Sequence, residues 1–222
     1  MNQTIWNRIN RTWQSVFDGT FITEEILVTV DDFEYGWLTM TLSTHKGQKI
    51  IIDMSDVYSP LCNLREMISG WSVMEGVMEI MIDCEGYKVM IGMKPTGGYD
   101  KQNKDYYGIL TCYTLGEDDE DVDNSLVALV NMGRVAESIY TALKTTILRS
   151  RALLEDPEMW EEHDIREEYL DGTLHPKTYR KELFNHNLRI PFLAPPPPPP
   201  PPPIKKWGVF FLFFSKIFCF KK

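Results

Sequence analysis

Acidic side chains are the residues of this sequence with the clearest capacity for chemistry. Asp53, Asp56, Asp83 and Glu85 end predicted strands near turns, where carboxylates can face one another for acid/base catalysis. Turns also require acids and glycine for purely structural reasons. No nucleophile elbow or glycine-rich phosphate loop accompanies these carboxylates. A small enzyme that uses Asp53, Asp56 and Asp83 is therefore kept as an alternative, and no catalytic residue is assigned.

A second group of acids suits partner binding better than metal binding. If a calcium-binding loop began at Asp119, its sixth position would need glycine and its twelfth a bidentate acid. These positions hold Asn124 and Val130, so the stretch does not match a calcium loop. His163 and Glu167 lie one helical turn apart, and His175 and His186 are available as further ligands, but nothing in the sequence places them beside this pair. No metal or cofactor is expected. The acids assigned to partner binding are Glu161, Glu162, Glu167, Glu168, Asp118, Asp119 and Asp121.

The overall charge supports the same interpretation. The 222 residues include 23 basic and 32 acidic ones, a formal charge of −9. Residues 1–203 contain all of the acids but only 18 of the bases, which leaves −14 for that part of the chain. Such a surface repels a phosphate backbone, so nucleic-acid binding is not expected. A basic protein partner is the expected ligand.

The cysteines and the N-terminus predict a cytoplasmic protein. Cys62, Cys84, Cys112 and Cys219 form no C-x-x-C pair, which favours free thiols in a reducing compartment. Residues 1–17 are polar and rich in asparagine, so we expect no signal peptide.

The N-terminal half of the chain has clear secondary-structure patterns. Ile5, Ile9 and Trp13 predict an amphipathic helix within residues 1–19, and packing on a sheet is favoured over partner binding. Alternating apolar residues predict strands at 26–30, 38–42 and 50–54, which form a meander with one solvated face. Ser59 and Pro60 then predict an N-cap and the first turn of a helix that ends near Trp71.

The following segments alternate between strand and helix. The pattern predicts a hairpin whose strands, 77–82 and 87–93, flank the turn Asp83–Gly86. It predicts a long loop over 94–105 and a sixth strand over 106–115. Apolar residues at spacings of three and four predict a long helix over 125–154, capped by Asp123 or Asn124. A charged helix from Trp160 to Leu170 and a short basic helix over 177–184 complete the pattern.

Two motifs carry a resemblance to a protein family. Ser55-Asp56-Val57-Tyr58-Ser59-Pro60 leads into a helix, and Asp83-Cys84-Glu85-Gly86 forms a turn. Over residues 24–115 this resembles a group of small uncharacterised bacterial proteins with a Ser-Asp-Val-aromatic-x-Pro junction and an Asp-x-Glu-Gly hairpin turn. The resemblance implies an α+β fold and no site residues.

The C-terminal segment differs in composition from the rest of the chain. Residues 195–203 are nine prolines, and residues 204–222 contain six Phe and five Lys. Residues 207–220 are too few for the roughly 20 that span a bilayer, although flanking lysines suit a membrane interface. Slippage in a C-rich codon tract, followed by a frameshift into AT-rich sequence, would also give this composition. We favour that origin and expect the native chain to differ after about Ala194.

The predicted fold is α+β, an antiparallel five- or six-stranded sheet crossed by the Pro60–Gly70 helix and followed by a helical extension. The expected function is a non-enzymatic protein-interaction module of the immunity or adaptor type. A peripheral membrane or small-ligand binder that uses the tail or a methionine-rich face is a further alternative, and membrane association is expected only if the tail is genuine. That methionine face comprises Met74, Met78, Met81, Met90 and Met93. The predicted regions are a sheet domain at 1–115, an acidic loop at 116–124, a helical region at 125–194, a polyproline run at 195–203 and a tail at 204–222.

Overall fold

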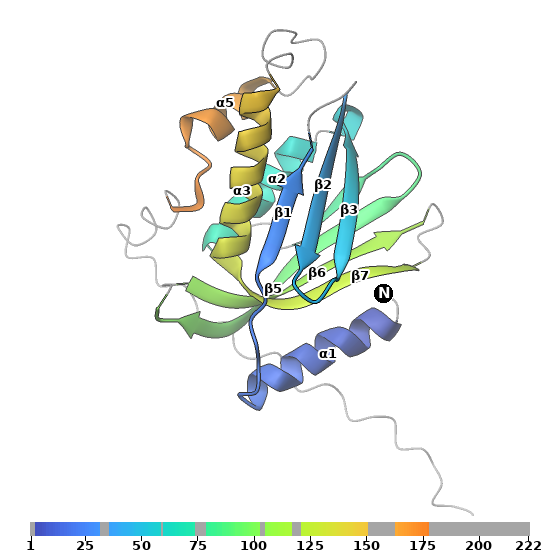
Figure 1. Ribbon diagram of the computed structural model, residues 1–222, viewed down its shortest axis with the longest axis vertical. Helices are drawn as coiled ribbons and strands as arrows, with labels where there is room; N and C mark the ends of the chain where they lie inside the picture. The colour runs from blue at the N-terminus through green and yellow to red at the C-terminus, as the bar shows by residue number, and fades with distance from the viewer. Residues whose placement is uncertain are drawn as a thin grey trace, which may run out of the picture. The chain divides into compact units, whose positions relative to one another are not determined.

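The computed structural model describes residues 3–31, 36–58, 60–73, 79–102, 105–116, 121–150 and 163–177. These residues form two antiparallel sheets packed with helices (Figure 1). The predicted α+β class is confirmed, but the described strands number seven in two sheets instead of five or six in one. The first sheet has the order β1 (Ile26–Val30), β2 (Trp37–Thr44), β3 (Lys49–Ser55), and the second β4 (Glu79–Asp83), β5 (Lys88–Asp100), β6 (Asp105–Leu115), β7 (Asp121–Asn131).

The first sheet is the predicted meander with one solvated face. Leu38, Met40 and Ile52 have no exposed surface, because alternate residues of β2 and β3 point into the main core. The residues between them face outward, and Ile51 is 43% exposed. Alternation in the sequence therefore predicted this sheet correctly.

Strands β6 and β7 of the second sheet are buried on both faces. One face joins the main core, and helix α1 (Gln3–Phe17) covers the other (Figure 1). Ile5 and Trp13 of α1 pack against Ile109, Val127 and Leu129. The prediction that the N-terminal helix packs on a sheet is confirmed.

The prediction of one long helix over residues 125–154 was wrong, and burial of β7 on both faces explains why. Residues 121–131 form β7, and helix α3 (Met132–Arg149) begins only afterwards. Leu126 and Val130 point into the main core while Leu129 packs under α1, so the strand reads as an unbroken apolar run. The cap is Asn131, whose side chain accepts a hydrogen bond from the Arg134 amide, instead of Asp123 or Asn124.

The prediction of a long loop over residues 94–105 was also wrong. Strands β5 and β6 continue as a hairpin whose last paired residues are Asp100 and Asp105. Among the described residues, β4 pairs with β5 as far as Gly92. Tyr99 and Tyr106 pack edge to face at 4.9 Å near the hairpin end.

Two further helices complete the described chain. Helix α2 (Pro60–Val73) starts at the predicted proline and packs against α3 and β4. Ser59, the predicted cap, lies outside the described residues. Helix α5 (His163–Asp171) covers part of the predicted 160–170 helix, and the Tyr140 hydroxyl of α3 donates to the Tyr169 carbonyl of α5 at 3.0 Å. Only Lys177 of the predicted 177–184 helix is described. No helix among the described residues is long and apolar enough to cross a bilayer.

Candidate functional site

The free edge of β1 has backbone groups that face away from its sheet. The Asp31 amide donates to the Thr39 carbonyl at 2.9 Å, so the odd-numbered residues of β1 bond to β2. The backbone groups of the even-numbered residues Ile26, Val28 and Val30 therefore point to the free edge. Among the described residues, the one hydrogen bond on this edge comes from the Thr146 hydroxyl to the Val30 carbonyl at 3.0 Å.

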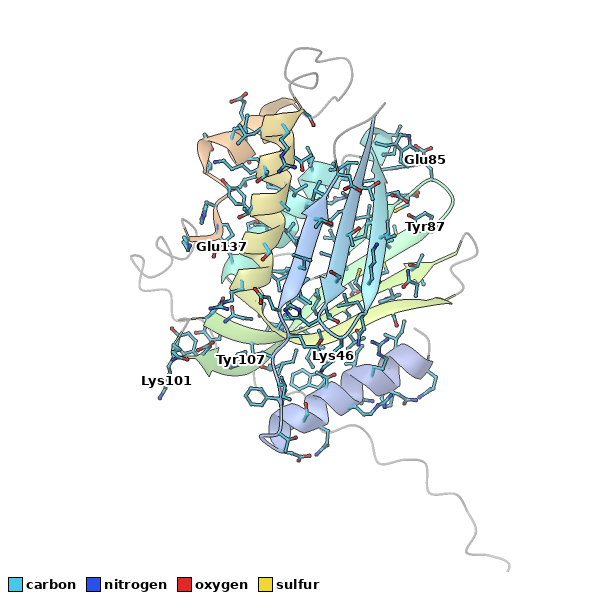
Figure 2. All side chains as sticks on the ribbon, in the orientation of Figure 1. Lys46, Glu85, Tyr87, Lys101, Tyr107 and Glu137 are labelled. Carbon is cyan, nitrogen blue, oxygen red and sulfur yellow. The ribbon has the colours of Figure 1, made fainter. Side chains whose placement is uncertain are left out.

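The free edge of β3 is contacted by the second sheet at one position, Asp53. The Asp53 amide donates to the Tyr87 hydroxyl at 3.3 Å, and that hydroxyl donates to Asp53 Oδ2 at 3.1 Å. The Thr39 hydroxyl donates to the other carboxylate oxygen at 2.7 Å. Tyr87 lies at the β4–β5 hairpin, beside β3 (Figure 2). This contact joins the two sheets and occupies the backbone amide of Asp53 on the β3 edge.

The free edge of β7 is covered by three different side chains or backbone groups. Arg8 donates to the Ser125 carbonyl at 3.1 Å, and the Val127 amide donates to the Gln48 side chain at 3.1 Å. The Glu24 amide donates to the Leu129 carbonyl at 2.8 Å. Exposed strand edges invite pairing with other chains, and covering them is the usual remedy.

A groove of about 590 Å³ runs along the free edge of β1. One wall is β1 itself, and the other is α3, which lies beside β1 in Figure 1. Leu27, 62% exposed, lies on the β1 side. Most side chains of the α3 wall are small, and the two large ones are charged, Glu137 and Arg149. The small ones are Ser138, Thr141, Ala142, Thr145 and Thr146. We call this the β1 groove.

A second cavity of about 360 Å³ adjoins the β1 groove at the start of β1, and the two share Glu25, Ile26, Glu137 and Ser138. Figure 2 shows Glu137 on α3 and Tyr107 on β6, two of the residues that line it. Its charged lining is four carboxylates and one guanidinium, from Glu24, Glu25, Asp100, Glu137 and Arg134. We call this the acidic pocket.

The acids predicted for partner binding do not gather at one place in the described structure. Glu167 is exposed on α5, and Glu168 forms an ion pair with Arg65 at 3.4 Å. Asp121 opens β7, on the opposite side of Figure 1 from α5, and its side chain is not described. Asp118, Asp119, Glu161 and Glu162 lie outside the described residues. Their role stays a prediction.

The strand-end carboxylates serve structural contacts where they are described. Asp53 accepts from Thr39 and Tyr87, and Asp83 Oδ1 accepts from the Glu85 amide at 3.0 Å within the turn. Neither residue lines the β1 groove or the acidic pocket. The Asp56 side chain is not among those described. Two of the three candidate catalytic carboxylates, Asp53 and Asp83, therefore accept hydrogen bonds that stabilise the fold.

Three cysteines, Cys62, Cys84 and Cys112, are described, and all three are free thiols. Burial raises the pKa of Cys84 from 9.0 to about 12, and the nearby charges of Asp53 and Asp83 add to the effect. Burial also raises the pKa of Cys112. Both thiols are protonated at neutral pH and are poor nucleophiles. Within the described residues, no group of three or more His, Cys, Asp and Glu side chains could hold a metal ion.

These two thiols predict a loss of stability at alkaline pH. Between pH 9.0 and about 12, Cys84 keeps its proton in the folded chain and loses it in the unfolded chain. The free energy of unfolding should then fall by about 1.4 kcal/mol per pH unit for each thiol. Urea unfolding at a series of pH values above 9.0 measures this slope. The Cys84→Ala/Cys112→Ala double variant should show a shallower slope, and an unchanged slope would contradict the assignment.

The methionine-rich face is divided between core and surface. Met93 is buried, Met90 is half-buried, and Met81 is 48% exposed. Met74 and Met78 lie outside the described residues, as does the C-terminal tail. No continuous methionine groove follows from the described residues.

Comparison with protein-family models, curated proteins and solved structures gives no match for this chain. The resemblance to small bacterial proteins is therefore still a prediction. The four acids of the pocket, Glu24, Glu25, Asp100 and Glu137, were not among the residues selected from the sequence. The pair Glu24–Glu25 directly before a strand was a usable signal, but the sequence does not reveal that this strand lies at a sheet edge.

Proposed function

We propose that this chain is a protein-interaction module that binds an extended segment of a basic partner along the β1 groove. The observation that carries the proposal is the free edge of β1, where the backbone groups of Ile26 and Val28 face the groove. An extended peptide can add to such an edge by pairing its own backbone with the strand. Main-chain pairing then provides affinity, and the groove walls provide specificity.

Two of the other sheet edges support this choice. The edge of β7 is covered by Arg8, Gln48 and Glu24, and the edge of β3 is contacted by Tyr87 at Asp53. An edge left available beside a groove, in a fold that makes contacts at these two edges, is suited to pairing with another chain.

Charge favours a basic partner over a second copy of this chain. Glu25 is exposed for 77% of its side chain at one end of β1, and Asp31 follows the other end. Two β1 strands paired antiparallel around Val28 would bring Glu25 opposite Asp31 twice, and like charges in that position are destabilising. A segment with lysine or arginine near its ends meets the same acids favourably.

Site-specific photo-crosslinking tests the proposed function. A benzoylphenylalanine in place of Leu27, on the β1 side of the groove, should crosslink a partner in lysate of the source cells. The same group in place of Ile51, which is 43% exposed on β3, is the matched control. Mass spectrometry should map the Leu27 crosslinks to one extended, basic segment. Equal crosslinking from both positions, or crosslinks scattered over unrelated proteins, would refute the proposal.

A further inference from the structure

Two buried polar atoms of the acidic pocket have no hydrogen-bond partner among the described residues. They are Oε2 of Glu24 and Nδ2 of Asn131. Both residues line the pocket, and Asn131 is only 8% exposed. Buried polar atoms without a partner are rare in folded proteins, because leaving one unpaired is costly.

The amide orientation of Asn131 is determined by its role as helix cap. Its Oδ1 accepts a hydrogen bond from the Arg134 amide at 3.3 Å, so the other amide atom is the donor Nδ2. The first turn of α3 also has a positive partial charge. Asn131 therefore offers a hydrogen-bond donor that suits a carbonyl oxygen.

Glu24 offers a negatively charged hydrogen-bond acceptor, whereas Asn131 offers a donor. Its Oε1 accepts from the Lys46 ammonium at 2.9 Å, and its backbone amide is held by the Leu129 carbonyl. Its side chain is only 13% exposed, which leaves Oε2 as a fixed acceptor. Four carboxylates and one guanidinium line the pocket, and two of these carboxylates also pair with lysines, Glu24 with Lys46 and Glu137 with Lys177 at 2.6 Å. A cationic donor suits this position.

We propose that the acidic pocket recognises one basic side chain of the segment bound along the β1 groove. The cation donates to Glu24 Oε2, and a carbonyl oxygen of the same segment accepts from Asn131 Nδ2. This inference rests on the proposed function, because the pocket and the groove share the residues at which the segment would pass from one to the other.

Titration with a blocked amino acid tests the inference without knowledge of the partner. N-acetyl-L-arginine methylamide supplies the cation and the carbonyl, and the citrulline analogue is its neutral isostere. Added to the full chain labelled with ¹⁵N, the arginine probe should shift the amide resonances around Glu24 and Asn131 saturably. The citrulline analogue should bind about tenfold more weakly or worse, because it lacks the charge-assisted hydrogen bond.

Two variants locate the binding. Glu24→Gln should weaken the arginine probe by about tenfold or more, whereas Glu79→Gln, at an exposed acid on β4, should not. Asn131→Ser keeps a good helix cap but replaces the amide donor Nδ2 with a shorter hydroxyl that already serves as the cap, so it should weaken both probes.

Equal binding of arginine and citrulline probes, unchanged binding by Glu24→Gln, or absence of saturable shifts would each overturn the inference. The comparison of the two probes needs no variant and is independent of any folding defect. If the probe fails while crosslinking from Leu27 succeeds, the pocket assignment is wrong and the proposed function stands. If crosslinking from Leu27 fails, the proposed function itself is wrong.

Discussion

The Tyr87→Phe variant should lower the free energy of unfolding by about 2–3 kcal/mol. The lost hydroxyl donates to Asp53 Oδ2 at 3.1 Å and accepts from the Asp53 amide at 3.3 Å. Its removal leaves a partly buried carboxylate and an edge amide without these partners, and it breaks a contact between the two sheets. Chemical denaturation followed by circular dichroism measures the loss.

Tyr99→Phe is the matched control for this prediction. Tyr99 is 40% exposed, so loss of its hydroxyl should change stability by less than about 0.5 kcal/mol. A double-mutant cycle with Asp53→Ala should give a coupling of about 1 kcal/mol or more between Tyr87 and Asp53. A Tyr87→Phe variant as stable as the parent chain would show that this contact does not hold the sheets together.

The Val28→Pro variant should lose partner binding by about tenfold or more while keeping its fold. The Val28 amide points to the free edge of β1, so proline removes a donor that pairs with the bound segment and spares the ladder to β2. Binding is measured as the affinity for the segment identified by crosslinking from Leu27. Circular dichroism and the unfolding midpoint check the fold.

Val28→Thr is the control, because threonine keeps both the branched shape and the backbone amide. It should bind as the parent chain does. A folded Val28→Pro variant with full affinity would mean that the segment does not pair with β1.

The first sheet could be predicted from sequence because its strands alternate between apolar and polar residues. Leu38, Leu42 and Ile52 point to one core, and the residues between them meet water. The second sheet was harder, since α1 covers its outer face. Val127 and Leu129 face α1, whereas Leu126 and Val130 face the main core, so both sets are apolar. The alternation of apolar and polar residues that marks a strand is therefore absent from this part of the sequence.

The β5–β6 hairpin was missed for a different reason. Pro95, Gly97 and Gly98 are typical of loops, and Gly97 has a positive φ of 78°. The register is irregular between Pro95 and Tyr99, so this stretch includes the irregularity its composition predicted, yet pairing resumes beyond it. These residues form a strand because they pair with β6. Such pairing depends on another segment of the chain, so the local sequence does not reveal it.

The acidic character of the proposed binding surface could be predicted, but its location could not. A charge of −14 over residues 1–203 already favoured a basic partner. The acids that line the pocket come from the start of β1, the end of β5 and the first turns of α3. Their meeting depends on strand order and on helix packing, which no local pattern encodes.

Amide hydrogen exchange along β1 is the most direct measurement of strand addition at this edge. The exchange of Ile26 and Val28 is compared in the free chain and in its complex with the segment identified by crosslinking. Protection of Ile26 and Val28 should rise by about tenfold or more in the complex, because their amides gain partners. Leu27 and Thr29, which already bond to β2, are internal controls and should change little. Unchanged exchange at Ile26 and Val28 in a formed complex would contradict strand addition at β1.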